Sequence, residues 1–273
     1  MTYAMRFGVI LLSLAGLIGL GGCDGGDGDG EGDAGDPQAD AGAGGDDDAG
    51  STPAALRDVT LSITGADPHM GQLVDIRIVD EWDNLVARGV IAGLPSGAYD
   101  FALPHSTPEG AHRLDFFADL SGNDAYDAPP ADHAWRMDVA ADGDAVVSFV
   151  HNTDFTDIAS PAIHQGGDLT LDVSGVDPHV GQLFEVRVIR TDNDQLVGRY
   201  VLPAITEAAF TVVLEDILDD GVEYQVDYFA DLSDNGSYDA PPTDHAWRDV
   251  VTADASGATV DFVHNTDFTD VEF

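Results

Sequence analysis

Residues 115–136 read DFFADLSGNDAYDAPPADHAWR, and residues 227–248 read DYFADLSDNGSYDAPPTDHAWR, so that 17 of 22 positions are identical. Two shorter stretches also recur: residues 65–73 (GADPHMGQL) return as 175–183 (GVDPHVGQL), and residues 149–157 (FVHNTDFTD) return unchanged at 262–270. The period of about 112 residues predicts two copies of one domain. A unit of roughly 100 residues is large enough to enclose its own core.

Within each copy, hydrophobic residues alternate with polar ones, as at Val59, Leu61 and Ile63. Short runs of β-branched and aromatic residues, broken by Gly, Pro, Asn and Asp, are typical of strands. In the first copy they predict strands near residues 57–64, 72–79, 84–91, 98–103, 111–119, 134–141 and 144–151. Seven such strands resemble a β-sandwich of immunoglobulin or transthyretin-like type. We therefore expect an all-β fold of two tandem seven-stranded antiparallel β-sandwiches, with Trp135 and Trp247 in their cores.

The N-terminal residues have the pattern of a secretory signal. Arg6 precedes an apolar run at residues 7–20, which is too short to span a membrane as a stable helix. The next residues, Leu20-Gly-Gly-Cys23, resemble the lipobox of bacterial lipoproteins. That resemblance implies lipid attachment to Cys23 and cleavage before it; the alternative is an ordinary secretory signal with an incidental cysteine. Cys23 is the only cysteine, so its lipidation would exclude disulfides and a cysteine nucleophile.

Five parts follow from these patterns. They are a lipoprotein signal peptide (1–22), a lipidated cysteine with a disordered acidic stalk (23–54), a first sandwich repeat (55–158), a linker (159–166) and a second sandwich repeat (167–273). Residues 24–53 contain 10 acidic residues and no basic one, so the stalk should be a self-repelling spacer.

The predicted location is the cell envelope, with a lipid anchor. Asp24 after the cysteine resembles an inner-membrane retention signal of enteric bacteria, whereas an acidic run there resembles a surface-export signal of other groups. We favour the outer membrane or the cell surface over the inner membrane.

The chain is strongly acidic, with 51 Asp and Glu against 10 basic residues and a formal net charge of −41. Binding to a phosphate backbone needs clustered Lys and Arg, so a nucleic-acid partner is excluded. The expected partners are the membrane, through the N-terminal lipid, and an unidentified surface protein or glycan. Metal cations also suit such a charge.

Strand parity predicts where the repeated polar residues lie. In an antiparallel sandwich each strand carries the chain from one pole to the other. The connections after the first and fifth strands and the end of the seventh therefore share a pole. This gathers Asp67–His69, Asp119–His133 and His151–Asp154 at one end of the first repeat.

One candidate site at this pole is a calcium loop. Oxygen side chains at every second position of a loop can converge on one hard cation. Residues 119–127 and 231–239 have this spacing, and they resemble the first nine positions of EF-hand loops, as in dockerins. Prolines replace the bidentate Glu of the twelfth position, and Asp132 or Asp244 is the candidate substitute. The predicted ligands are Asp119, Ser121, Asn123, Asp127, Asp132, Asp231, Ser233, Asn235, Asp239 and Asp244. The alternative is a loop of Asx-turns without an ion.

Histidine provides a second candidate site. Six of the nine histidines form matched pairs: His69 with His179, His133 with His245, and His151 with His264. Three imidazoles at one pole could ligate zinc or copper. The alternative is that each histidine makes a hydrogen bond within its loop.

Together these features favour a lipid-anchored extracytoplasmic binding or structural module with calcium at one pole of each repeat. The alternative function is a copper- or zinc-binding or delivery lipoprotein that uses the paired histidines. We expect no enzyme, because the chain has no nucleophile elbow, no HExxH and no phosphate loop.

Overall fold

The structure is a computed structural model, and it describes residues 55–158, 166–271 and 273. The predicted signal peptide, Cys23, the acidic stalk and most of the predicted linker lie outside these residues. None of the described residues forms a helix long and apolar enough to cross a membrane.

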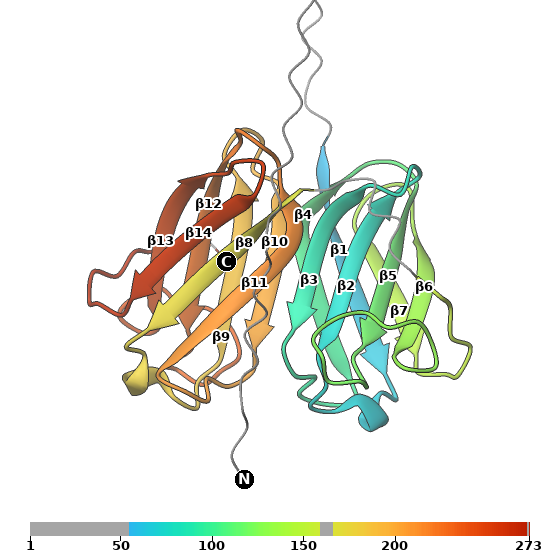
Figure 1. The fold of residues 1–273 in the computed structure, drawn as a ribbon, viewed down its shortest axis with the longest axis horizontal. Helices are drawn as coiled ribbons and strands as arrows, with labels where there is room; N and C mark the ends of the chain where they lie inside the picture. Colours follow the sequence, from blue (N-terminus) through green and yellow to red (C-terminus); the bar gives the residue numbers. More distant parts are fainter. Residues whose placement is uncertain (1–54, 159–165, 272) are drawn as a thin grey trace, which may run out of the picture. The chain divides into compact units, whose positions relative to one another are not determined.

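The first repeat contains seven strands and one short 3-10 turn (Figure 1). They are β1 (Leu56–Thr64), η1 (Asp67–His69), β2 (Val74–Asp80), β3 (Leu85–Ile91), β4 (Tyr99–Pro108), β5 (His112–Ala118), β6 (His133–Val139) and β7 (Ala145–Val150). The predicted strands agree with these bounds to within two residues except at β4, which continues past the predicted end. There the chain bulges: His105 has a positive φ of 46°, and its amide donates to Asp58 at 2.9 Å.

The second repeat has the same order of elements. They are β8 (Gly167–Ser174), η2 (Asp177–His179), β9 (Phe184–Arg190), β10 (Leu196–Leu202), β11 (Ala209–Leu218), β12 (Glu223–Ala230), β13 (His245–Thr252) and β14 (Gly257–Val263). The all-β prediction is confirmed for the part of the chain that the structure describes.

Each repeat packs a three-stranded sheet against four strands of a larger sheet. The small sheets have the orders β4-β1-β7 and β11-β8-β14. Side chains of β1 point alternately towards the core and towards solvent, which buries Val59, Leu61 and Ile63 against the larger sheet. Trp135 lies in the same core. Trp247 is likewise buried in the core of the second repeat, as predicted.

The pairing differs from a wholly antiparallel sandwich at two equivalent places. Strand β1 pairs with β7 in parallel, and β8 pairs with β14 in parallel. The reason is strand parity: the first and seventh strands of each repeat run towards the same pole, so they can only be parallel once they become neighbours.

The two repeats also share a sheet, which the sequence did not predict. The four-stranded sheets join into one eight-stranded sheet of order β13-β12-β9-β10-β3-β2-β5-β6. At the junction β3 pairs with β10 in parallel, with Gly198 opposite Arg88 and Val201 opposite Ile91. Because equivalent strands run in parallel there, η1 and η2 lie at the same end of the shared sheet (Figure 1).

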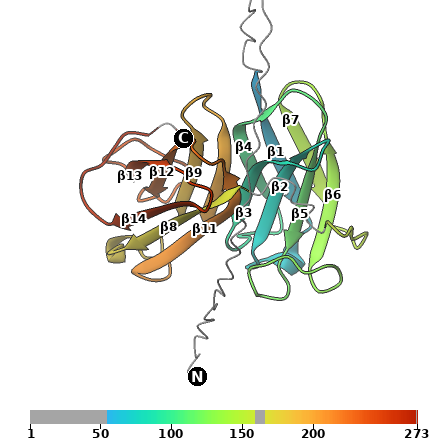
Figure 2. The same ribbon diagram turned by 45° about the horizontal axis from the view of Figure 1, so that its top comes forward.

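Two arginines, the buried Arg88 and the partly buried Arg199, link the two repeats at this junction. Arg88 of β3 donates to Asp75 at 2.8 Å and to the carbonyl of Glu215 in the second repeat at 2.9 Å. Arg199 of β10 donates to Glu185 at 2.7 Å and to the carbonyl of Ala102 in the first repeat at 2.6 Å. Since each arginine crosses from one repeat to the other, the four-stranded sheets are held together by charged groups as well as by the backbone ladder. Figure 2, turned by 45°, shows β3 and β11 meeting at this junction.

Candidate metal centre

Three histidines converge at one pole of the first repeat. His69 ends η1, His133 begins β6 and His151 follows β7. The Nε2 atom of His69 lies 3.0 Å from Nε2 of His151 and 3.4 Å from Nδ1 of His133. All three candidate ligand atoms lie within 4.8 Å of one another. Strand parity thus places the histidines together, as the sequence predicted.

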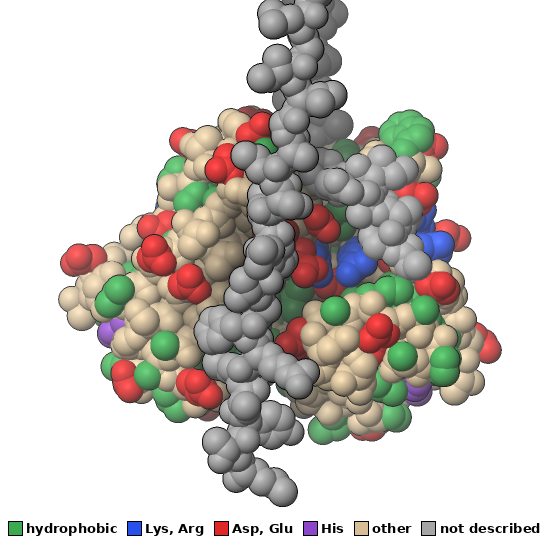
Figure 3. Space-filling model, viewed as in Figure 1, with side chains coloured by type: hydrophobic (Ala, Val, Ile, Leu, Met, Phe, Trp, Pro, Cys, Tyr) green, Lys and Arg blue, Asp and Glu red, His purple; other side chains and the backbone are tan. Residues whose placement is uncertain are grey.

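The second repeat builds the same arrangement. The Nε2 atom of His179 lies 3.1 Å from Nε2 of His264 and 3.3 Å from Nδ1 of His245. We call each set of three a histidine cluster. Both clusters lie at the end of the shared sheet that carries η1 and η2, and histidine side chains are visible near the lower edge of both repeats in Figure 3.

Aromatic residues hold the imidazoles in place. The buried Trp135 ring lies edge-on to His69, with the ring centroids 5.7 Å apart. Phe155 stacks on His133 with centroids 4.0 Å apart and an interplanar angle of 23°. In the second repeat Phe268 stacks on His245 at the same distance. These contacts restrict ring rotation, so the nitrogen atoms are already oriented towards one another.

Burial and proximity favour the neutral form of the outer histidines. Burial lowers the pKa of His133, the neighbouring His69 and His151 lower it further, and Asp132 opposes them. The pKa of His151 is lowered by burial and then by His69. The same causes lower the pKa of His245 and of His264 in the second repeat. Neutral imidazole is the form that ligates a metal.

The spacing of the nitrogen atoms fits a transition metal. Zinc bonds to imidazole nitrogen at about 2.0–2.1 Å, and tetrahedral geometry then separates two ligand nitrogens by about 3.3 Å. The separations from Nε2 of His69 are 3.0 and 3.4 Å in the first cluster, and those from Nε2 of His179 are 3.1 and 3.3 Å in the second. Three imidazole nitrogens suit zinc or copper rather than calcium, which prefers oxygen.

The predicted calcium loop lies next to the cluster but has a different arrangement. We call residues 119–132 and 231–244 the acidic loops. Asp132 accepts hydrogen bonds from the amides of Leu120 at 3.0 Å, Ser121 at 3.1 Å and Asp127 at 2.7 Å. Asp244 accepts the equivalent three in the second repeat. Both carboxylates are completely buried, so they close their loops from within.

The first residue of each loop is engaged in the same way. Asp119 accepts from the amides of Gly122 at 2.6 Å and Asp124 at 2.8 Å. Burial alone would raise the pKa of the Asp119 carboxyl, but these amides and the Ser121 hydroxyl hold the pKa below its ordinary value. In the second repeat, Asp231 accepts from the Ser233 hydroxyl at 3.0 Å and from the Gly236 amide at 2.7 Å.

The remaining predicted calcium ligands are joined to one another. Asn123 donates to Asp127 at 3.0 Å, and Asn235 donates to Asp239 at 2.7 Å. In the described residues, the groups of three acidic, histidine or cysteine side chains with ligand atoms within 4.8 Å are the two histidine clusters. Calcium binding by the loops therefore stays a prediction, and the Asx-turn alternative describes the hydrogen bonds that are present.

Sequence reasoning missed several residues of the site. Gln72 and Gln182 contact the buried histidines: their Oε1 atoms lie 2.8 and 2.7 Å from Nδ1 of His69 and His179. Phe155 and Phe268 were also missed. All four lie in the repeated stretches 65–73 and 149–157 and their copies, so their recurrence was the signal that could have identified them.

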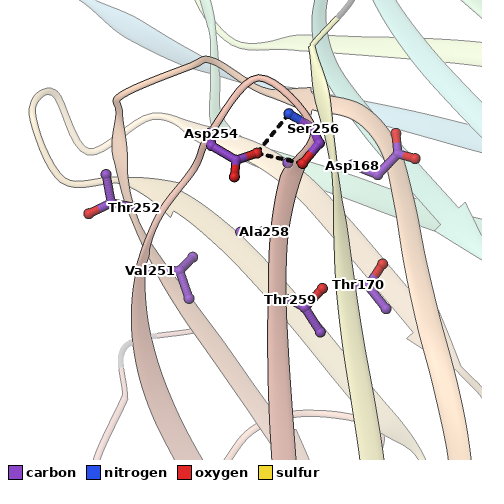
Figure 4. Close-up of a pocket in the computed structure, with 9 residues that line it drawn as sticks. Asp168, Thr170, Val251, Thr252, Asp254, Ser256, Ala258 and Thr259 are labelled. Carbon is purple, nitrogen blue, oxygen red and sulfur yellow. Dashed lines mark hydrogen bonds between the residues drawn. The ribbon is translucent and has the colours of Figure 1, made fainter. Parts of the chain in front are cut away.

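A surface pocket at the other end of the second repeat offers different chemistry. It is lined by Asp168, Thr170, Val251, Thr252, Asp254, Ser256, Gly257, Ala258 and Thr259 (Figure 4). Its carboxylate Asp254 accepts from the amide and hydroxyl of Ser256. The lining contains no histidine, and the pocket lies where β8 and β14 begin, away from the cluster at their ends.

Comparisons with known proteins show only distant likeness. The chain matches no protein-family model and no curated protein. Among solved structures it is similar to the Bacillus anthracis TIE protein, with a TM-score of 0.23 and 9% identity over 78% of this chain, and it spans only 34% of the length of that protein. A protein from Bacteroides ovatus described provisionally as an adhesin gives a TM-score of 0.23 and 10% identity, covering 76% of this chain and 87% of the other. A provisionally described cell adhesion protein from Parabacteroides distasonis gives 0.21 and 11%, covering 81% and 91%.

Proposed function

We propose that this protein is a lipid-anchored binding module of the cell envelope whose two histidine clusters each take one zinc or copper ion. The observation that carries the proposal is the convergence of three imidazole nitrogens, repeated in both halves of the chain. This geometry therefore favours zinc or copper binding by the histidines over calcium binding by the acidic loops. The proposal is one of binding; it includes no catalytic step.

Three ring nitrogens facing one another explain why a metal suits the cluster. Neutral imidazoles at 3.0–3.4 Å repel unless a proton or a metal ion lies between the nitrogens. Only one N–H can occupy the short contact between His69 and His151, whereas a metal ion engages all three rings. An ion held by the three histidines would keep a fourth tetrahedral position for water or a partner's ligand.

The placement of the clusters supports a role in display at the cell surface. Strand β1 begins at Leu56, where the described chain starts, and ends at the pole that carries His69. The described chain thus enters this domain at the pole away from the histidine cluster. Exposed hydrophobic residues recur next to the buried histidines, as Met70 and Val180, and in the acidic loops, as Leu120 and Leu232. They suit contact with a protein or glycan partner at the outer membrane or cell surface.

Metal stoichiometry tests the proposal. Equilibrium dialysis of the full chain against zinc, and separately against copper, should give two ions per wild-type chain. At a free-ion concentration between the Kd of an intact cluster and that of a weakened one, one ion should remain in His69→Ala and none in the double variant with His179→Ala. Structural zinc sites contribute about 10–16 kcal/mol over four ligands, so losing one ligand should weaken a site about a hundredfold.

His105→Asn is the matched control, because His105 lies outside both clusters and Asn tolerates its positive φ of 46°. It should bind two ions. Two tightly bound ions in the double alanine variant would show that the clusters are not the metal sites.

A further inference from the structure

Each cluster contains one histidine that differs from the other two. His69 and His179 are buried, with 2% and 1% of their surface exposed, whereas the other four histidines are only partly buried. In each cluster, the Nε2 atom of the buried histidine is the atom that both other rings approach. A metal in the cluster therefore depends on a free lone pair at this nitrogen.

The other ring nitrogen faces a glutamine. Nδ1 of His69 lies 2.8 Å from Oε1 of Gln72, and Nδ1 of His179 lies 2.7 Å from Oε1 of Gln182. An amide oxygen can only accept, so Nδ1 must carry the proton. A neutral imidazole protonated at Nδ1 has its lone pair at Nε2, which is directed into the cluster.

The turn between the two residues fixes this contact. The amide of Gln72 donates to the carbonyl of His69 at 3.0 Å, and its own carbonyl accepts from Leu94 at 2.8 Å. Gly71 has φ of +80° and Gly181 has φ of +93°, a conformation that L side chains rarely adopt. This geometry explains why Asp-Pro-His-x-Gly-Gln recurs in both repeats: the glycine reverses the chain so that the glutamine reaches the ring three residues earlier.

We propose that Gln72 and Gln182 are positioning residues, whose side-chain oxygens hold His69 and His179 protonated at Nδ1 and so present Nε2 to the metal. The inference rests on the proposed function. Hydrogen-bond acceptors behind a ligating histidine fix its tautomer and orientation, and their removal weakens metal binding about 10- to 100-fold. A purely structural glutamine would stabilise the turn without changing metal affinity.

The test isolates one cluster in the full chain. In an H179A background only the first cluster should bind, and Q72M and Q72E are compared there with Gln72 retained. Methionine keeps the length of the side chain but removes the strong acceptor, whereas glutamate keeps an acceptor. Zinc affinity is measured by competition with a chromophoric chelator, and the tautomer of His69 in the metal-free protein is read from long-range ¹H–¹⁵N spectra.

We expect Q72M to weaken zinc binding about 10- to 100-fold and to populate the Nε2-protonated tautomer of His69. Q72E should bind zinc at least as tightly as the parent and keep the Nδ1-protonated tautomer. A metal-free thermal melt shows whether each variant is folded, and Q182M in an H69A background repeats the test in the second cluster. Zinc binding within twofold of the parent in folded Q72M overturns this inference alone. A parent that binds neither zinc nor, in the same competition, copper overturns the proposed function and this inference together; if the parent binds copper alone, the variants are compared by their copper affinity.

Discussion

The histidine cluster and the acidic loop of the first repeat are neighbours, since Asp132 closes the loop and His133 is the next residue. Their polar atoms are nevertheless used in different ways. The loop carboxylates of Asp119 and Asp132 face backbone amides at 2.6–3.1 Å, whereas the ring nitrogens of the cluster face one another. The second repeat shows the same contrast.

The contrast shows that residue type and spacing are not enough to identify a metal site. Carboxylates at alternate positions suit calcium, but here most of their lone pairs are engaged by the loop itself. The histidines have no comparable spacing in sequence, yet their nitrogens converge. The decisive property is whether a lone pair already has a donor.

Zinc and calcium should therefore have unequal effects on thermal stability. Binding to the folded state alone contributes about 2.7 kcal/mol at 100-fold over the Kd, which raises the midpoint of a domain this size by about 5–10 °C per site. We expect zinc to raise the melting midpoint by several degrees and calcium, at the same free concentration, by less than about 1 °C. Melts after EDTA treatment measure both, with magnesium as a control. A calcium shift as large as that of zinc, abolished in Asp231→Ala, would reinstate the calcium loop.

Removing the carboxylate that closes the loop should lower stability even without metal. Asp132→Ala leaves three backbone amides without their acceptor, and an unsatisfied buried group costs about 1–3 kcal/mol. We expect a loss of about 2 kcal/mol, or a midpoint about 4–8 °C lower, measured in EDTA. Asp127→Ala is the control, because that exposed side chain accepts only from Asn123 in this loop. A defect seen only when calcium is present would contradict a loop that is closed by its own hydrogen bonds.

Much of the fold could be predicted from the sequence. The period of two located the strands of the first repeat, and strand parity brought His69, His133 and His151 together. The shared sheet could not be predicted, because β3 and β10 lie where the repeats share little beyond hydrophobic rhythm. Their pairing also depends on backbone hydrogen bonds, which leave no side-chain pattern.

The site was predictable only as a set of residues. Recurrence showed that the histidines are retained, but nothing in their spacing indicates which ring nitrogen faces the cluster. That choice depends on Gln72, whose approach to His69 depends on the positive φ of Gly71. The acidic loop was the reverse case: its spacing suggested an ion, while the amides that occupy its carboxylates become apparent only in three dimensions.

The smallest expected effect concerns the pH dependence of folding stability in the metal-free protein. The histidine cluster and the acidic loop should affect stability in different pH ranges. The lowered pKa values of His133 and His151 mean that the unfolded chain takes up protons first, near the ordinary histidine pKa of about 6.5. Stability should therefore fall as the pH drops from about 7.5 to 5.5 and level off below the folded-state pKa. The lowered pKa of Asp119 affects folding stability in a lower pH range. The stability that this carboxylate contributes is complete above about pH 4 and is lost only as the pH falls through the folded-state pKa of Asp119.

Thermal melts in EDTA at pH 7.5 and 5.5 measure this difference. The combined variant His133→Gln, His151→Gln, His245→Gln and His264→Gln should lose less stability between the two pH values than the wild type. Asp119→Asn should be less stable at both pH values while keeping the wild-type difference between them, because its carboxylate is fully ionised across this range. An equal pH effect in the glutamine variant and the wild type would assign the titration to other groups.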